Sequence, residues 1–253
     1  MDFSLSEEEK GARRMLRGFA MRAIGPRAAV VDADPEHRFD WELVGKADGL
    51  HIMGMPIPEE YDGAGLSLFS LFIAAEELAY GDAGFSSCIG ISWLNEVMIL
   101  MEGRPENYRR FLPMLSSEEG VMSANAVTEA MGVSDSWTYN RYIPGTLRTM
   151  SRRDGNDYVT NGGLAGLYLV LASLDPGGGR DRSAYFYVTG DAPWVSVGRV
   201  EDKMGQRALQ NAEVVFADVR VPAGTSKARR EKACGTWRTC IIPWLAGRRA
   251  RAP

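Results

Sequence analysis

The chain contains 253 residues, of which 45% are hydrophobic and 25% are charged, and its mean hydropathy is -0.20. These values are typical of a globular protein, and they exclude a disordered chain, a collagen-like chain and a disulfide-stapled scaffold. The length predicts one to two domains of about 100–200 residues each.

The net charge of -4 is unevenly distributed along the chain. Residues 223–253 carry eight Lys or Arg side chains and one acid, a charge of +7, so the remaining residues sum to -11. An acidic body argues against nucleic-acid binding, which requires a positive surface for phosphate. We therefore expect no nucleic-acid partner.

Cysteine and histidine are scarce, with only Cys88, Cys234, Cys240, His37 and His51. Their number and spacing match no zinc-ligand pattern, so we expect no metal site. No apolar stretch reaches the ~18 residues of a membrane span. The N-terminus lacks the positive and apolar regions of a signal peptide. These observations favour a cytoplasmic protein with reduced thiols.

The first 115 residues have the pattern of helices. Ser6-x-x-Glu9 is a capping box, and apolar residues at helical spacing follow it until Pro26, where we expect the helix to end. Further helices are expected after the N-caps Asp40 and Ser67, over residues 86–101, and from the first-turn proline Pro105.

Short segments rich in Val, Tyr, Phe and Thr follow, separated by Gly, Asp and Pro. The expected strands are residues 121–127, 145–150, 157–160, 167–174, 184–189, 195–200 and 212–221. No helix-length segment lies between them, which favours an antiparallel sandwich or barrel over a Rossmann alternation. The predicted fold class is α+β, with an all-helical domain over 1–117, a β-domain over 118–222 and an irregular basic tail over 223–253.

Four blocks of this sequence resemble the FAD-dependent acyl-CoA dehydrogenase family. They are residues 3–8, residues 58–65 with 76–79, residues 126–135, and residues 201–208 with 216–222. The blocks occur in order and cover residues 1–222. The resemblance implies the N-terminal helical and middle β-domains of that family.

The third and fourth blocks carry the residues to which the resemblance assigns roles. It implies that Asn125, Ala126, Val127, Thr128 and Ser134 contact FAD, and that Ser134 and Arg207 contact the substrate. Two alternatives stay open: an ordinary strand that leaves a sandwich through a Ser-Asp turn, and a β-turn with a solvated arginine.

The sequence departs from the family pattern in three places. Ala130 and Val133 replace a proline and a glycine of the flavin signature, and the block after Gly162 lacks roughly one strand. The family's C-terminal helical bundle, on the order of 150 residues, has no counterpart after Pro222. That bundle supplies the catalytic glutamate, so the catalytic residue is unknown and we expect a truncated chain. The sequence leaves open whether residues 223–253 are native or a frameshift product.

The resemblance implies oxidation of an acyl-CoA to the 2-enoyl-CoA, with FAD as hydride acceptor. It also implies an electron-transfer flavoprotein as partner, and a homo-oligomer if the full architecture is present. One alternative is a catalytically inactive remnant, or a module that binds an acyl-CoA or a protein partner. Another is a related flavin monooxygenase or oxidase.

Overall fold

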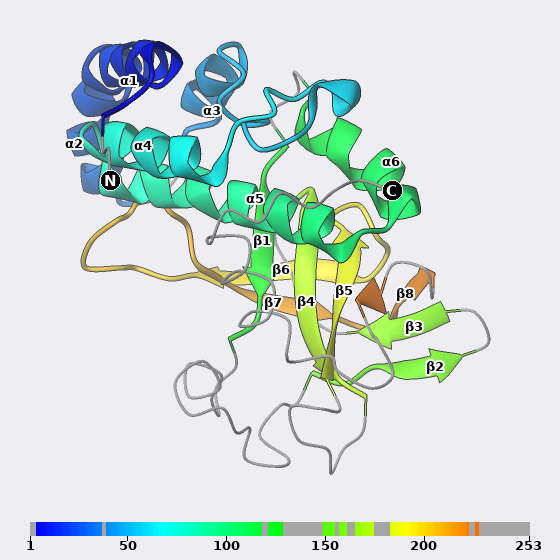
Figure 1. The fold of residues 1–253 in the computed structure, drawn as a ribbon. Coiled ribbons are helices and arrows are strands. Elements are labelled where there is room, and N and C mark those ends of the chain that lie inside the picture. The colour runs from blue at the N-terminus through cyan, green and yellow to red at the C-terminus, as the bar shows by residue number, and fades with distance from the viewer. Residues whose placement is uncertain are drawn as a thin grey trace. The chain divides into compact units, whose positions relative to one another are not determined.

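The computed structural model describes residues 4–36, 39–117, 121–128, 149–154, 157–160, 165–174, 183–222 and 226–227. The described residues form two compact units. The first runs up to Met122 and includes Arg199–Ala212, and the second contains Ser123–Gly198 and the described residues from Glu213 onward. Figure 1 shows the elements of both. The contiguous domain boundaries expected above stay predictions, and the units add that residues 199–212 belong with the helices.

The first unit is helical and precedes the sheets along the chain, which confirms the predicted order. Its helices are α1 (Glu7–Phe19), α2 (Gly25–Ala33), α3 (Trp41–Asp48), α4 (Leu68–Ala79), α5 (Ala83–Glu102) and α6 (Pro105–Leu115), with a π-helical turn η1 (Ala20–Ile24) and a 3-10 helix η2 (Glu59–Tyr61). The Ser6 hydroxyl accepts from Glu9 N at 3.2 Å, while Glu9 Oε2 accepts from Ser6 N at 2.7 Å. Asp40 and Ser67 also cap their helices as predicted.

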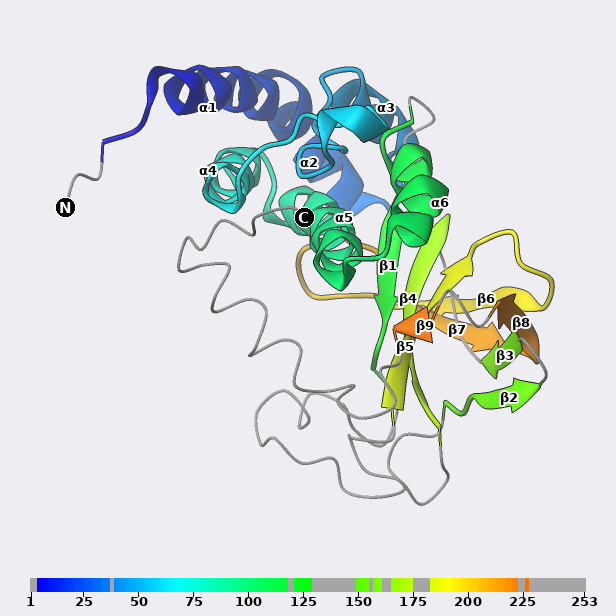
Figure 2. The same ribbon diagram turned by 45° about the vertical axis from the view of Figure 1, so that its right-hand side comes forward.

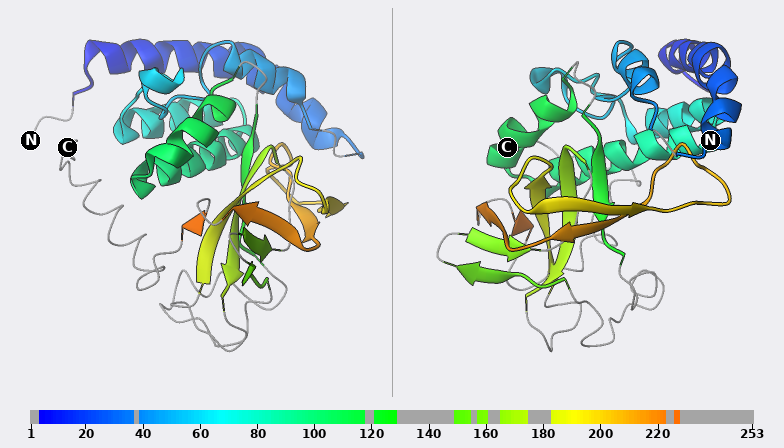
Figure 3. Two further views of the ribbon diagram at one scale, coloured as in Figure 1. Left: turned by 90° about the vertical axis from the view of Figure 1, so that its right-hand side faces the viewer. Right: turned by 180° about the vertical axis from the view of Figure 1, so that it is seen from behind.

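The prediction that the first helix ends at Pro26 is wrong. The chain stays helical through η1 into α2, and Pro26 lies in the first turn of α2 (Figure 3). A proline needs no N–H partner in a first turn. The preceding Gly25 has no Cβ to clash with the proline ring, so it keeps a helical φ of -55°. Its N–H donates to the carbonyl of Ala20 across the wider π turn.

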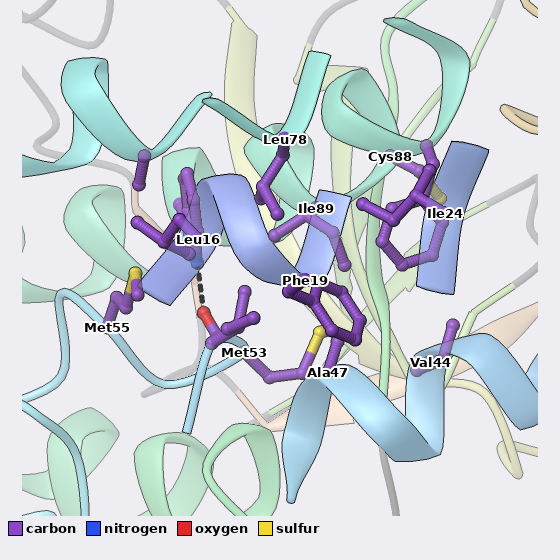
Figure 4. Close-up of a cluster of buried hydrophobic side chains, with 14 of the residues drawn as sticks. Leu16, Phe19, Ile24, Val44, Ala47, Met53, Met55, Leu78, Cys88 and Ile89 are labelled. Atoms are coloured by element: carbon purple, nitrogen blue, oxygen red, sulfur yellow. Dashed lines mark hydrogen bonds between the residues drawn. The ribbon is translucent and has the colours of Figure 1, made fainter. Parts of the chain in front are cut away.

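A hydrophobic core joins the helices of the first unit. Leu16 and Phe19 from α1 meet Leu78 from α4 and Ile89 from α5 in one buried cluster (Figure 4). Trp93 of α5 lies in the same cluster, and its Nε1 donates to the carbonyl of Ile52 at 2.7 Å. Each Leu, Ile or Phe side chain buried in this way stabilises the fold by about 1.5–3 kcal/mol.

Helix α5 is the one described helix that is long and apolar enough to cross a membrane. In its most apolar window, 67% of the residues are buried inside the protein. The core helix of a folded domain has the same length and composition, and α5 is such a core helix.

The second unit consists of strands. They are β1 (Ser123–Ala126), β2 (Arg152–Asp154), β3 (Asp157–Thr160), β4 (Leu167–Ser173), β5 (Ser183–Thr189), β6 (Val195–Val200), β7 (Ala212–Phe216), β8 (Val219–Pro222) and β9 (Ser226–Lys227). They form sheets in the orders β1-β4-β5-β9, β2-β3-β8 and β6-β7. Of the strand expected over 145–150, residues 145–148 lie outside the described residues and Met150 forms an isolated bridge with Ser173.

The antiparallel expectation needs one correction, because β1 pairs with β4 in parallel. The pairs β4–β5, β2–β3, β3–β8 and β5–β9 are antiparallel. Figure 2 shows β1 beside β4 and β5. The sequence predicts local strands by alternation and turn residues, but a long connection such as residues 127–166 leaves the direction of pairing undetermined.

The expected strand over 212–221 is two strands, β7 and β8. Asp218 between them has a φ of 55°, in the left-handed region that a strand residue does not adopt. Asp tolerates this conformation better than most residues. The chain therefore turns at Asp218, and β8 pairs with β3 rather than continuing β7.

The core of the second unit lies on one face of the β4–β5 pair. Tyr168 and Val170 of β4 pack with Phe186 of β5, and Phe216 and Val221 pack against them from β7 and β8. The rings of Tyr168 and Phe216 meet edge to face at a centroid distance of 6.1 Å. This is the two-layer packing expected of a sandwich.

Candidate functional site

Four of the residues predicted to contact a cofactor lie at the end of strand β1 or directly after it. Asn125 and Ala126 end the strand, opposite Leu169 and Val170 of β4. Val127 and Thr128 follow directly. Among the described strands β1 is at the edge of its sheet, so only its β4 side is paired.

The side chains of β1 alternate between two faces. Ala124 and Ala126 pack against the core of the second unit. Neighbouring residues of a strand point to opposite faces, so Asn125 points away from that core. Asn125 and Val127 are partly buried, and Thr128 is exposed.

The end of this strand carries hydrogen-bonding groups on the side away from β4. A parallel edge strand leaves alternate backbone N–H and C=O groups free on its outer side. The amide of Asn125 and the hydroxyl of Thr128 add further donors and acceptors. A flat heteroaromatic ring with polar edge atoms fits such an arrangement. Ser134 lies outside the described residues, so its predicted contacts stay predictions.

Arg207 lies in the first unit, in the loop between β6 and β7. Its Nη1 donates to Asp202 Oδ1 at 2.8 Å and to the carbonyl of Lys203 at 3.1 Å. The Arg207 side chain is 20% exposed, whereas that of Asp202 is 74% exposed. The guanidinium is therefore neither fully solvated nor free of partners, and in this structure it fixes the shape of its own loop. Its predicted substrate contact stays a prediction.

The same loop is fitted to the first turn of α5. A Cβ on Gly84 would lie 2.9 Å from the backbone carbon of Gln206, which has a φ of 52°. Glycine at position 84 is what allows this approach. Ala208 and Leu209, just beyond, pack against the core of the first unit.

Sequence reasoning missed the buried polar residues of α5. Glu96 is fully buried, and neither of its carboxyl oxygens has a hydrogen-bond partner among the described residues. Burial raises the pKa of Glu96 well above its ordinary value. The signal available in the sequence was a glutamate in the middle of a mostly uncharged helix. Because Glu96 is enclosed, it is not a base that can reach a bound substrate.

Glu77 of α4 is a second buried acid. Its side chain is 1% exposed, and Arg13 Nε donates to it at 2.6 Å while Arg17 Nε binds its other oxygen. Burial works to raise the pKa of Glu77, but the hydrogen bonds and charges of the two arginines outweigh it, so the pKa is lowered. The adjacent Glu76 is exposed.

Comparisons with known proteins bear on what this geometry is for. Residues 6–119 match the family model of the acyl-CoA dehydrogenase N-terminal domain. The chain is 35% identical over 239 residues to cyclohexane-1-carbonyl-CoA dehydrogenase of Geobacter metallireducens. The alignment covers 91% of this chain and 60% of that relative. The N-terminal part of the chain therefore resembles the N-terminal domain of acyl-CoA dehydrogenases.

Solved structures of acyl-CoA dehydrogenases have the same fold as this chain. Butyryl-CoA dehydrogenase of Megasphaera elsdenii superimposes with a TM-score of 0.78 at 28% identity, over 89% of this chain and 60% of that one. Glutaryl-CoA dehydrogenase of Mycobacterium smegmatis, in complex with FADH2, gives 0.73 at 26% identity, over 90% and 57%. The chain thus spans about 60% of the length of the relatives it matches.

Proposed function

We propose that this chain acts in the oxidation of an acyl-CoA to the 2-enoyl-CoA, with FAD as hydride acceptor. Two findings support the proposal: the similarity of the chain to acyl-CoA dehydrogenases, and the place of β1, which leads into Val127 and Thr128, at the edge of its sheet among the described strands. The edge strand is the observation that carries the assignment to particular residues. A bound flavin would supply the acceptance of hydride at its ring nitrogen.

The residues of this chain would bind and orient the ring. The backbone groups of residues 125–128 on the side away from β4 would hydrogen-bond the polar edge of the ring, and Thr128 would add its hydroxyl. Ala126 anchors the strand in the core of its unit, so the hydrogen-bonding groups are held on a rigid element. A rigid support is what a cofactor site requires.

Removal of the α-proton of a thioester needs a positioned general base, which contributes about 10²–10⁴-fold. Among the described residues we assign no such base. This observation favours one alternative function, a module that binds an acyl-CoA without turnover. An electron-transfer flavoprotein as partner, homo-oligomerisation and a cytoplasmic location belong to the proposal through the family resemblance and the sequence.

The test is a titration of the purified chain with FAD, followed by absorbance and by quenching of flavin fluorescence. We expect saturable binding at one FAD per chain, and bleaching of the flavin band by an acyl-CoA if the chain turns over. Binding without bleaching would favour the non-catalytic module. A folded chain that takes up no FAD would contradict the proposal.

Matched variants assign the binding to β1. We expect Asn125→Ala and Thr128→Val each to weaken FAD binding by about fivefold to tenfold, the effect of losing one hydrogen bond worth about 1 kcal/mol. The control is Asn211→Ala, because Asn211 is exposed before β7. Equal affinities for all three variants would remove β1 from the site.

A further inference from the structure

Two arginines of α1 are held side by side by one glutamate of α4. Arg13 Nε donates to Glu77 Oε1 at 2.6 Å, and Arg17 Nε donates to the other oxygen of the same carboxylate. Because both hydrogen bonds end on one carboxylate, the two guanidinium groups lie next to each other. We call Arg13 and Arg17 the arginine pair.

The orientation of the arginine pair is fixed by its surroundings. The Glu77 side chain is 1% exposed, so the carboxylate that orients both guanidinium groups is anchored inside the protein. The Arg17 guanidinium also lies over the ring of Tyr80, with its central carbon 3.6 Å from the ring centroid. A guanidinium that is already held in this way loses little conformational freedom when it binds a ligand.

The outer side of the arginine pair is accessible to solvent. The side chains of Arg13 and Arg17 are 50% and 36% exposed. Each arginine uses its Nε for Glu77, and among the described residues no other side chain accepts a hydrogen bond from either of them. Both Nη atoms of each guanidinium therefore remain available as donors to a ligand.

This set of donors suits a phosphate group better than a carboxylate. One guanidinium fork already matches both oxygens of a carboxylate, whereas a phosphate group has three terminal oxygens and can accept from two forks. Two acids limit the affinity. Glu77 neutralises one of the two arginines, and the charge of the exposed Glu76 adds to that of Glu77 in raising the pKa of the Arg13 guanidinium. We therefore expect binding in the millimolar range.

We propose that Arg13 and Arg17 bind a phosphate group, which is either free phosphate or the phosphomonoester of a larger ligand. In the bound state the Nη atoms donate to the terminal oxygens of the phosphate, while Glu77 keeps both Nε atoms in place. The site lies within the first unit, on α1 and α4. It uses none of residues 125–128, so it stands apart from the function proposed above.

The test is titration of the full chain with inorganic phosphate at constant ionic strength, followed by phosphorus NMR. We expect saturable binding of one phosphate per chain. Arg13→Gln should weaken binding by about tenfold, the effect of losing a charge-assisted hydrogen bond. Glu76→Gln should instead tighten binding by about twofold to threefold, because it removes a nearby negative charge. A variant that merely damaged the fold would not bind phosphate more tightly.

The matched control is Arg14→Gln. Arg14 is exposed on the same helix and is not one of the two arginines that bind Glu77. Its substitution should change the affinity by less than about twofold. A loss equal to that of Arg13→Gln would show attraction to the general charge of α1, and it would overturn the proposal. A folded chain that binds no phosphate at millimolar concentration, or whose affinity falls in Glu76→Gln, would overturn it as well.

Competition distinguishes the two sources of the phosphate group. Coenzyme A carries a 3′-phosphomonoester, and dephospho-coenzyme A lacks it. Displacement of bound phosphate by coenzyme A alone would assign the site to a phosphomonoester ligand, and displacement by neither would assign it to free phosphate. Equal displacement by both compounds would overturn the requirement for a terminal phosphate group.

Discussion

Glu76 and Glu77 are neighbours in the sequence with opposite surroundings in the fold. Glu77 is enclosed and holds two arginines of α1, whereas Glu76 faces solvent. Helical geometry separates their directions by about 100°. The pair therefore allows a comparison in which position and chemistry are almost constant and burial differs.

We expect Glu77→Gln to lower the free energy of unfolding by about 1.5–3 kcal/mol, the contribution of hydrogen bonds to charged groups. The loss stays below that of a fully buried pair because Arg13 and Arg17 are partly exposed. Urea unfolding of the variant and of the control Glu76→Gln measures it. The free energy of unfolding of the control should stay within about 0.5 kcal/mol of that of the unchanged protein. Equal losses in both variants would contradict the stabilising role of the contacts between Glu77 and the two arginines.

Glu96 should make the stability of the protein depend on pH, because burial raises its pKa in the folded state. Below the ordinary Glu pKa of about 4.3 the side chain is protonated in both the folded and the unfolded state, so it does not reduce the free energy of unfolding. As the pH rises above that value, the unfolded state loses the proton first and the free energy of unfolding falls. We expect Glu96→Gln to stabilise the protein by about 1–3 kcal/mol at pH 7.5 and to change little at pH 4. Urea midpoints at both pH values measure this. The control is Glu106→Gln at an exposed position. An effect of Glu96→Gln that is the same at both pH values would contradict the prediction.

At the scale of elements, the loop before α4 depends on close backbone packing. The N–H groups of Gly65 and Leu66 donate to the carbonyls of Ile57 and Met55 at 2.8 Å each. These bonds press Gly63 against Ile57, so that a Cβ on Gly63 would lie 2.0 Å from the Ile57 carbonyl oxygen. The block resembling the family's Pro-Glu-x-Tyr-Gly-Gly loop is thus a folded unit with a steric requirement.

We expect Gly63→Ala to destabilise the protein by at least about 3 kcal/mol, the upper end of overpacking costs. The matched control is Gly45→Ala in α3, where a Cβ meets nothing within 4 Å. That change should stabilise by up to about 1 kcal/mol, because alanine favours helix over glycine. Thermal unfolding of both variants measures the difference, and a tolerated Gly63→Ala would disprove the steric argument.

At the scale of the whole molecule, stability is shared between two separate cores. Leu78 is fully buried in the first and Phe186 in the second. We expect Leu78→Ala to cost about 2–5 kcal/mol and Phe186→Ala about 3–5 kcal/mol. The exposed Val30→Ala should change little. Urea unfolding followed by circular dichroism measures all three, and a loss below 1 kcal/mol at either core position would contradict its burial.

Local features were the part of the fold that sequence reasoning predicted well. The capping box at Ser6 and the caps at Asp40 and Ser67 form as expected. Such caps depend on side chains within three residues of one another, so the pattern contains the whole interaction. The strands of residues 167–173 and 195–200 follow for the same reason, since strand-favouring residues and the turn residues that separate them are local signals.

Tertiary structure decided what local pattern leaves open. Pro26 continues a helix because Gly25 and a π turn accommodate it, and β1 runs parallel to β4 because a long connection permits either direction. The burial of Glu77 between two arginines and the approach of Gln206 to Gly84 depend on partners far along the chain. The sequence by itself determined the resemblance to acyl-CoA dehydrogenases, the order of helices before sheets and the strand that ends at Asn125 and Ala126. Only the tertiary structure decided that this strand lies at the edge of its sheet among the described strands, because an edge depends on which other strands pair with it.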